Sequence, residues 1–153
     1  MHLNPKLDYV ASVSCSNCPR LVEFLDKSRK DNPNWHNDPV PSFGSINAEI
    51  LILGLAPGLR GANRTGRPFT GDFAGDTLYQ TLISHGFASG NYDPNGNDTL
   101  SLINVRIANA VRCVPPQNKP IGLEINNCRP FLSTELERMH QLKVILCLGR
   151  IAH

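Results

Sequence analysis

Two aliphatic runs that each end in a glycine place the strongest constraint on the fold of this chain. Residues 49–54 read Glu-Ile-Leu-Ile-Leu-Gly, and residues 143–149 read Lys-Val-Ile-Leu-Cys-Leu-Gly. A short, nearly continuous apolar run is typical of a strand that is buried on both faces, as in a parallel sheet covered by helices. The two runs therefore predict strands of a parallel sheet, with the loop after residue 54 at its carboxyl edge.

The rest of the chain has the patterns of helices and one further strand. The predicted elements are helices from just after Cys18 to about Lys30, at 73–84 and at 124–140, and a strand at 102–111. Arg106 and Asn109 are polar interruptions of that strand. The order strand, helix, strand, helix, strand predicts the α/β class. The third strand has no helix after it, so we expect one domain, 1–153, that is incomplete at its C-terminus.

Composition limits the class of protein. With 153 residues and 41% hydrophobic content, the chain can build a core without disulfides. The net charge of +2 neither requires nor excludes a polyanionic partner. The N-terminus does not have the pattern of a secretory signal, and no run approaches the ~20 apolar residues of a membrane span. We expect a soluble, cytoplasmic protein without a membrane partner.

Four of the five cysteines have a spacing typical of a soft metal centre. Cys15 and Cys18 form a close pair, and Cys113 and Cys128 lie fifteen residues apart much later in the chain. In a reducing cytosol, clustered cysteines are more often metal ligands or catalytic groups than disulfides. Four thiolates suit either zinc or an iron-sulfur cluster. Cys147 lies inside an aliphatic run, and we assign it to the core.

The loop at residues 54–72 is the second chemical feature. It contains five glycines and three arginines, together with Phe69 and Asp72. Glycines allow a ligand to approach the backbone closely, and the planar fork of arginine donors suits phosphates and base edges. The spacing is neither a Walker loop nor a dinucleotide fingerprint. The simpler interpretation is a strand-to-helix loop in which Asp72 caps the next helix.

Three segments of the chain match one known family. They are Gly-Leu-Ala-Pro-Gly (54–58), Asn-Arg-Thr-Gly-Arg-Pro-Phe-Thr-Gly-Asp (63–72) and Asn-Ala-Val-Arg-Cys-Val-Pro-Pro-Gln-Asn-Lys-Pro (109–120). Together with the cysteine spacing, they resemble the iron-sulfur uracil-DNA glycosylases, particularly the broad-specificity family 5. The resemblance implies a three-layer α/β sandwich with a central parallel sheet. Such proteins continue with a helix, a last strand and a His-containing motif, so the resemblance implies that the last strand is missing here and that this exact chain is nearly inactive.

The resemblance also implies roles in base excision for residues of the loop. Its base-binding backbone falls on five successive residues: Gly54, Leu55, Ala56, Pro57 and Gly58. Phe69 would stack on the extruded base, and Asp72 would act as a catalytic residue that positions water or stabilises the sugar cation.

Asn109 is the residue implied for selectivity and catalysis. Its carboxamide offers a donor and an acceptor that match the O4 and N3–H edge of uracil. Related family-4 enzymes carry an Asn at this position, whereas many family-5 members carry a small residue, so we expect a stronger preference for uracil than is usual for family 5. Asn118 is expected to support the same pocket. The simpler interpretation of both residues is a turn-forming asparagine.

The remaining expectations concern the cofactor, the partner and the activity. The resemblance implies a 4Fe-4S cluster on Cys15, Cys18, Cys113 and Cys128, with zinc as the rival. The side chains expected to contact DNA phosphates are Arg64, Arg67, Arg112 and Lys119. The implied activity is the hydrolysis of the N-glycosidic bond of uracil, hypoxanthine or xanthine in DNA by a monomer, associated with the nucleoid in a prokaryote. Two alternatives remain: a non-catalytic, metal-stabilised nucleic-acid-binding module, and a zinc-containing α/β nucleotide hydrolase.

Overall fold

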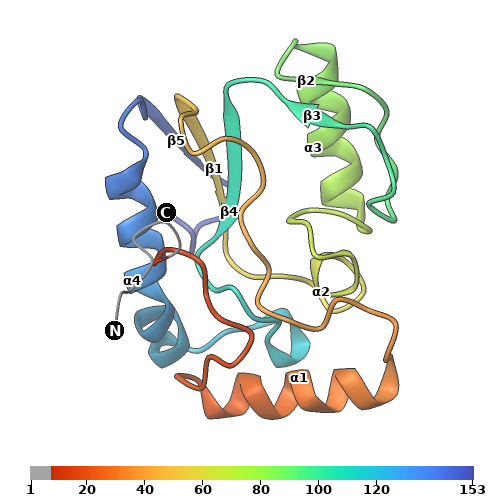
Figure 1. Cartoon of the computed structure of the whole chain (residues 1–153), viewed down its shortest axis with the longest axis vertical. Coiled ribbons are helices and arrows are strands. Elements are labelled where there is room, and N and C mark those ends of the chain that lie inside the picture. The colour runs from red at the N-terminus through yellow and green to blue at the C-terminus, as the bar shows by residue number, and fades with distance from the viewer. Residues whose placement is uncertain (1–7) are drawn as a thin grey trace.

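A parallel sheet of three strands lies at the centre of the computed structural model, which describes residues 8–153 (Figure 1). Its order is β4-β1-β5, with the bounds Val105–Asn109 for β4, Ile50–Gly54 for β1 and Val144–Cys147 for β5. Both neighbours of β1 run parallel to it, and Gly54 is in register with Asn109 at the carboxyl end. The predicted α/β class is confirmed.

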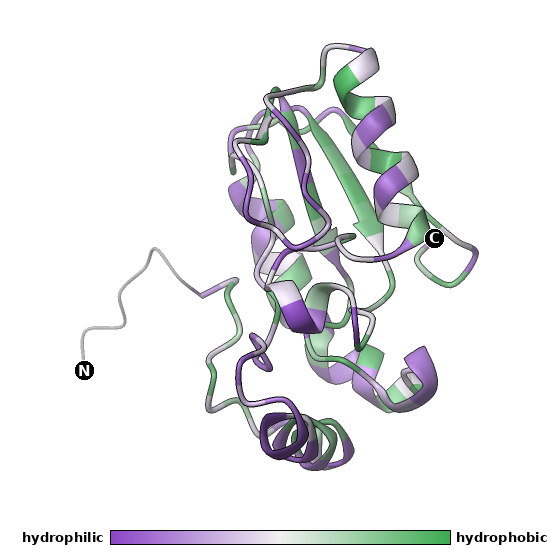
Figure 2. Cartoon of the chain, turned by 90° about the vertical axis from the view of Figure 1, so that its right-hand side faces the viewer, coloured by the Kyte–Doolittle hydropathy of each residue, from purple (hydrophilic) through white to green (hydrophobic). Residues whose placement is uncertain are grey.

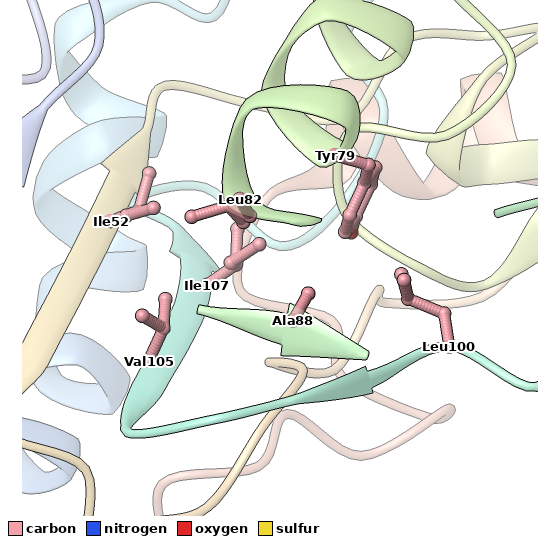
Figure 3. Packing of buried hydrophobic residues seen from close by; sticks show 7 residues of the cluster. All are labelled: Ile52, Tyr79, Leu82, Ala88, Leu100, Val105 and Ile107. Carbon is pink, nitrogen blue, oxygen red and sulfur yellow. The ribbon is translucent and has the colours of Figure 1, made fainter. Parts of the chain in front are cut away.

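Helices cover both faces of the sheet (Figure 1). Successive side chains of a strand point to opposite faces, and β1 follows this rule. Its Ile52 packs with Leu82 of α3 (Phe73–Ser84), and Figure 3 shows these two side chains close to Ile107 of β4. Leu51 and Leu53 instead join the cluster on the side of α4 (Gly122–Arg138). The sheet is therefore the middle layer of a sandwich.

The first helix, α1 (Pro19–Asp31), lies near the carboxyl end of the sheet (Figure 1). It begins directly after Cys18, with Pro19 at a first-turn position where a missing N–H costs little. Leu21, Leu25 and Ser28 are its buried residues, and their spacing of four and three places them on one face. Figure 2 shows hydrophilic residues over much of the rest of this helix. Its predicted bounds are confirmed to within one or two residues.

Several short elements were not predicted. They are α2 (Ala62–Thr65), the antiparallel pair β2 (Ala88–Ser89) and β3 (Ser101–Leu102), and the 3-10 turn η1 (Pro116–Asn118). The strand predicted at 102–111 is divided, because Asn104 adopts a left-handed conformation (φ 58°) between β3 and β4. The last predicted helix begins slightly earlier, at Gly122, and continues through Pro130.

The strand β5 lies at the edge of the sheet and pairs only with β1 among the described strands. Val144, Ile145 and Leu146 are 52%, 45% and 49% exposed. The aliphatic surface expected at the third strand is therefore present. Among residues 8–153, no helix combines the length and the apolar character needed to cross a membrane.

Candidate functional site

A pocket lies where β1 and β4 end, at the carboxyl edge of the sheet. Ligands of open α/β sheets bind at this edge because the loops that follow the strands converge there. The residues that line the pocket are Ala56, Pro57, Gly58, Ala62, Phe69, Asp72 and Asn109. The structure thus brings together most of the predicted base-binding and catalytic residues, which lie up to about a third of the chain apart in sequence.

Gly54 forms the floor beside this pocket. A Cβ atom added to Gly54 would lie 2.6 Å from Oδ1 of Asn109 and 2.6 Å from Cζ of Phe69. Only a glycine lets the aromatic ring and the amide approach the end of β1 so closely. Asn109 is 3% exposed, and within residues 8–153 its side-chain amide has no hydrogen-bond partner. Asn109 lines the pocket, and its amide is not among the fully buried, unpaired polar groups of residues 8–153, so the amide is available to a ligand there.

Phe69 is held in an unusual backbone conformation. Its φ of 56° is left-handed, which is uncommon for a bulky residue. A Cβ on Gly75 would lie 1.8 Å from the Phe69 carbonyl oxygen, so α3 packs directly against this peptide. The hydroxyl of Tyr79 donates to the Pro68 carbonyl at 2.6 Å. Residues of α3 therefore contact the carbonyl groups of both Pro68 and Phe69, and these contacts fix the position of the Phe69 ring at the pocket.

Arg67 is part of the same support, where its guanidinium pairs with a carboxylate of the protein; its contact with DNA stays a prediction. Its Nη1 and Nη2 donate to the two carboxylate oxygens of Asp98 at 2.9 and 2.7 Å. The guanidinium also lies 5.0 Å from the centre of the Phe43 ring and 5.2 Å from that of Tyr79. The hydrogen bonds from Arg67 lower the pKa of Asp98 to about 2. The Arg67 guanidinium therefore binds a carboxylate and aromatic rings within the protein.

Asp72 fulfils the simpler interpretation and also faces the pocket. Its Oδ1 accepts a hydrogen bond of 2.7 Å from the Gly75 backbone N–H and so caps α3. Its Oδ2 is directed toward the glycine loop, 3.9 Å from the position of a Cβ on Gly58 and 3.4 Å from one on Gly61. The Oδ1 of Asn118 lies 4.0 Å from the same Gly58 position. One oxygen of Asp72 thus fixes the side chain, and the other remains available at the pocket.

Arg112 is likewise engaged inside the protein, and its contact with DNA stays a prediction. Its side chain is 3% exposed and pairs with Glu135 at 2.5 Å, while Nη1 donates to Oγ of Ser42 at 2.6 Å. Arg106 binds the other carboxylate oxygen of Glu135, also at 2.5 Å. Burial raises the pKa of Glu135, but the two arginines outweigh it, so the pKa lies below its usual value. This triad joins β4 to α4 within the core.

The remaining cationic side chains near the site differ in whether they have hydrogen-bond or ion-pair partners in the protein. Arg64 donates from Nε to the Arg60 carbonyl and from Nη1 to Oδ1 of Asn95, each at 2.8 Å, so it braces the loop. Lys119 is exposed, and its DNA contact stays a prediction. Arg60, which the sequence reasoning did not select, is exposed and has no salt bridge within residues 8–153. The sequence contains no signal that distinguishes Arg60 from the two other arginines of the loop.

The four predicted cysteines line one apolar pocket between α1 and α4. Its walls include Leu21, Val111 and Phe131 as well as Cys15, Cys18, Cys113 and Cys128. Burial, together with the neighbouring thiols, raises the pKa of Cys113 to about 12.

The four cysteines share this pocket without forming a single-ion site. Among the residues described, no three His, Cys, Asp or Glu side chains are placed to hold one metal ion. All four thiols nevertheless line the same apolar pocket. The Arg112 backbone N–H donates to Sγ of Cys128 at 3.4 Å. Cys147 packs in the cluster on the α4 side of the sheet, as predicted.

Comparison with known proteins agrees with this arrangement. A family model described as the uracil DNA glycosylase superfamily matches residues 41–153, which include the whole pocket of β1 and β4. The chain belongs to the uracil DNA glycosylase superfamily. Among its relatives, a Type-5 uracil-DNA glycosylase of Thermus thermophilus is 44% identical over 145 residues, or 91% of this chain and 65% of that protein.

Two further relatives are named as Type-5 and Type-4 members of the uracil DNA glycosylase superfamily. A Type-5 uracil-DNA glycosylase of Pyrobaculum aerophilum is 36% identical over 92% of this chain and 63% of its own length. A Type-4 uracil-DNA glycosylase of Archaeoglobus fulgidus is 37% identical over 85% of this chain and 58% of its own length. The chain thus spans between about half and two thirds of the length of the curated relatives it matches.

Proposed function

We propose that this protein is a DNA repair glycosylase that hydrolyses the N-glycosidic bond of uracil in DNA. The observation that carries the proposal is the buried amide of Asn109, which is free of protein partners and lies beside Phe69 at the end of β1. A planar base that enters this pocket can stack on the ring and pair with the amide. Membership of the superfamily and the names of its relatives support the same activity.

Each pocket residue has a defined task in this reaction. A water oxygen bonds to C1′ of the sugar, the bond from C1′ to N1 of uracil breaks, and its electron pair leaves with the base. The proton that the water loses is finally taken up by the released uracil at N1. The amide N–H of Asn109 donates to O4, where negative charge develops on the leaving base, and its Oδ1 accepts from N3–H. The free Oδ2 of Asp72 faces the side of the pocket where it can orient the water and stabilise positive charge on the sugar. Cytosine presents the opposite hydrogen-bonding pattern, so the amide in this orientation discriminates against it.

The finer substrate range follows from the same amide. Stacking on Phe69 tolerates different bases, so hypoxanthine and xanthine can enter the pocket. The pairing of Asn109 with the O4 and N3–H edge favours uracil, and we infer that uracil is the preferred substrate. The DNA partner is one that contains deaminated bases, bound by a monomer in the cytoplasm or at the nucleoid.

We also propose that the four cysteines hold a 4Fe-4S cluster. Zinc bound by four thiolates at about 2.3 Å would need sulfur atoms that converge on one point. The four thiols line one apolar pocket without being placed around a single ion, which suits a larger group. When bound, the cluster supplies a cross-link between the segment before α1 and the segment between β4 and α4. Iron content and broad visible absorption after anaerobic purification would support it, whereas colourless protein with stoichiometric zinc would exclude it.

The test of activity is uracil release from a defined oligonucleotide by the protein expressed from its complete reading frame. Asp72→Asn keeps an oxygen that can cap α3 but removes the carboxylate, and we expect it to lower the excision rate at least hundredfold. Asp26→Asn, a change at an exposed carboxylate of α1, is the matched control and should leave the rate unchanged. A protein that binds the oligonucleotide but releases no uracil would instead support the non-catalytic nucleic-acid-binding module.

A further inference from the structure

The side chain of Phe73 stands in solvent directly beside the pocket. It is 85% exposed, the highest value of any large apolar side chain in residues 8–153. It follows Asp72 immediately and is the first residue of α3. The cap between Asp72 and Gly75 fixes the first turn of α3, so the backbone of Phe73 has a defined position relative to the pocket.

The backbone of an exposed arginine, Arg60, lies close to the segment that leads into Asp72. The carbonyl oxygen of Arg60 lies 3.0 Å from the position of a Cβ on Gly71, the residue before Asp72. The same carbonyl accepts a hydrogen bond from Arg64, which holds this part of the loop in place. The guanidinium of Arg60 is exposed, and it forms no salt bridge within the part of the chain that the structure describes. Arg64 is bound to other loop residues and Arg67 to Asp98, so Arg60 is the arginine of this loop that remains available.

We propose that Phe73 and Arg60 form a strand-binding rim, in which Phe73 stacks on a base next to the extruded nucleotide and Arg60 contacts a backbone phosphate. This inference rests on the proposed function and extends it from the extruded base to the flanking DNA. Removing a base from the stack exposes the face of its neighbour, and an aromatic side chain can cover that face. A ring and a guanidinium on one rim are the two contacts by which proteins hold single-stranded nucleic acid.

The rim makes a quantitative prediction about binding. Stacking of one base on an aromatic residue corresponds to roughly a five- to hundredfold effect on affinity. Phe73→Ala should weaken binding of a uracil-containing single strand by that factor, and Phe73→Trp should restore it. Arg60→Ala should reduce the slope of log affinity against log salt by about 0.7, the value for one phosphate on a single strand. Phe73→Ala should leave that slope unchanged.

The experiment measures fluorescence anisotropy of a labelled, uracil-containing single-stranded oligonucleotide at several salt concentrations. All proteins carry Asp72→Asn, so that uracil is not released from the oligonucleotide during the measurement. Ile103→Ala is the control for loss of exposed apolar surface, because Ile103 is 47% exposed in the connection between β3 and β4. We expect it to bind as tightly as the parent.

A second measurement separates this inference from the proposed function. Free uracil has no flanking nucleotide, so its inhibition of excision should be unchanged by Phe73→Ala in the otherwise unaltered protein, while KM for the oligonucleotide rises. If the protein excises uracil and Phe73→Ala changes neither KM nor affinity, the strand-binding rim is refuted and the proposed function stands. If the unaltered protein neither binds nor excises uracil in DNA, the proposed function fails and the rim fails with it.

Discussion

The ion pair between Arg67 and Asp98 lies next to the Tyr79 ring of α3, which supports the pocket. Removing this pair tests whether the structure assigns the partner of Arg67 correctly. The Asp98 side chain is 3% exposed. The hydrogen bonds from Arg67, together with those from the backbone N–H groups of Asp93 and Leu100, lower the pKa of Asp98 from 3.8 to about 2, and one pKa unit corresponds to about 1.4 kcal/mol. The ionised carboxylate with these partners therefore contributes about 2 kcal/mol to the free energy of unfolding at neutral pH, of which the pair with Arg67 is the largest part. Asp98→Asn also leaves the Arg67 cation without its partner, so we expect a total loss of about 3 kcal/mol.

The pH dependence follows from the direction of the shift. A carboxylate whose pKa is lowered on folding contributes stability above the pKa of the unfolded chain and loses it as the pH falls toward the folded value. The advantage of the unaltered protein over Asp98→Asn should be complete above about pH 4 and shrink between pH 4 and 2. Urea unfolding followed by far-UV circular dichroism at pH 7 and pH 3 measures both values.

An exposed pair provides the matched control. Asp26 and Arg29 pair at 2.7 Å on α1, but the Asp26 side chain is 55% exposed. Exposed pairs contribute about 0–1 kcal/mol, so Asp26→Asn should have a small effect at either pH. Arg67→Met combined with Asp98→Asn removes both charges and should recover part of the loss. Equal losses for the two single Asp variants, or a loss for Asp98→Asn that does not decrease in acid, would refute the reasoning.

Three further predictions concern the pocket and the core. Gly54→Ala inserts a methyl group 2.6 Å from both Asn109 and Phe69 and should lower uracil excision at least tenfold, while Gly122→Ala, which meets no atom within 4 Å, should retain full activity in the same assay. Asn109→Ala should reduce the ratio of uracil to hypoxanthine excision, and an unchanged ratio would remove its selectivity role. Glu135→Gln leaves two buried arginines without a carboxylate and should cost about 3–5 kcal/mol in urea unfolding; a loss below 1 kcal/mol would contradict the buried triad.

Local patterns were sufficient for the main elements of the fold and for much of the site. The aliphatic runs located β1 and β5 because such a run is visible in adjacent residues of the sequence, even though β5 is about half exposed in the structure. The family-like motifs located the loop that contains Phe69 and Asp72. The partners of the arginines could not be predicted. Arg67 meets Asp98, 31 residues away, and Arg112 meets Glu135, 23 residues away.

The difference has a physical basis. Whether a guanidinium binds DNA or a carboxylate depends on which segments the fold brings together. The hydrophobic periodicity of the sequence carries no information about such contacts. The short pair β2 and β3 was missed for a related reason: two-residue strands are too short for an alternating pattern.

The contact between Gly75 and the Phe69 carbonyl determines how far the glycine-rich loop can be separated from its surroundings. The backbone of Phe69 has a positive φ, and atoms outside the loop hold it in this conformation. These atoms are the first turn of α3 and the Tyr79 hydroxyl, which donates to the Pro68 carbonyl. Residues 54–72 grafted onto another strand-to-helix connection would carry Phe69 and Asp72 but neither the orientation of the stacking surface nor Asn109 of β4. The transferable unit for the stacking surface is the loop together with α3, and an engineered site must also supply the amide from a neighbouring strand.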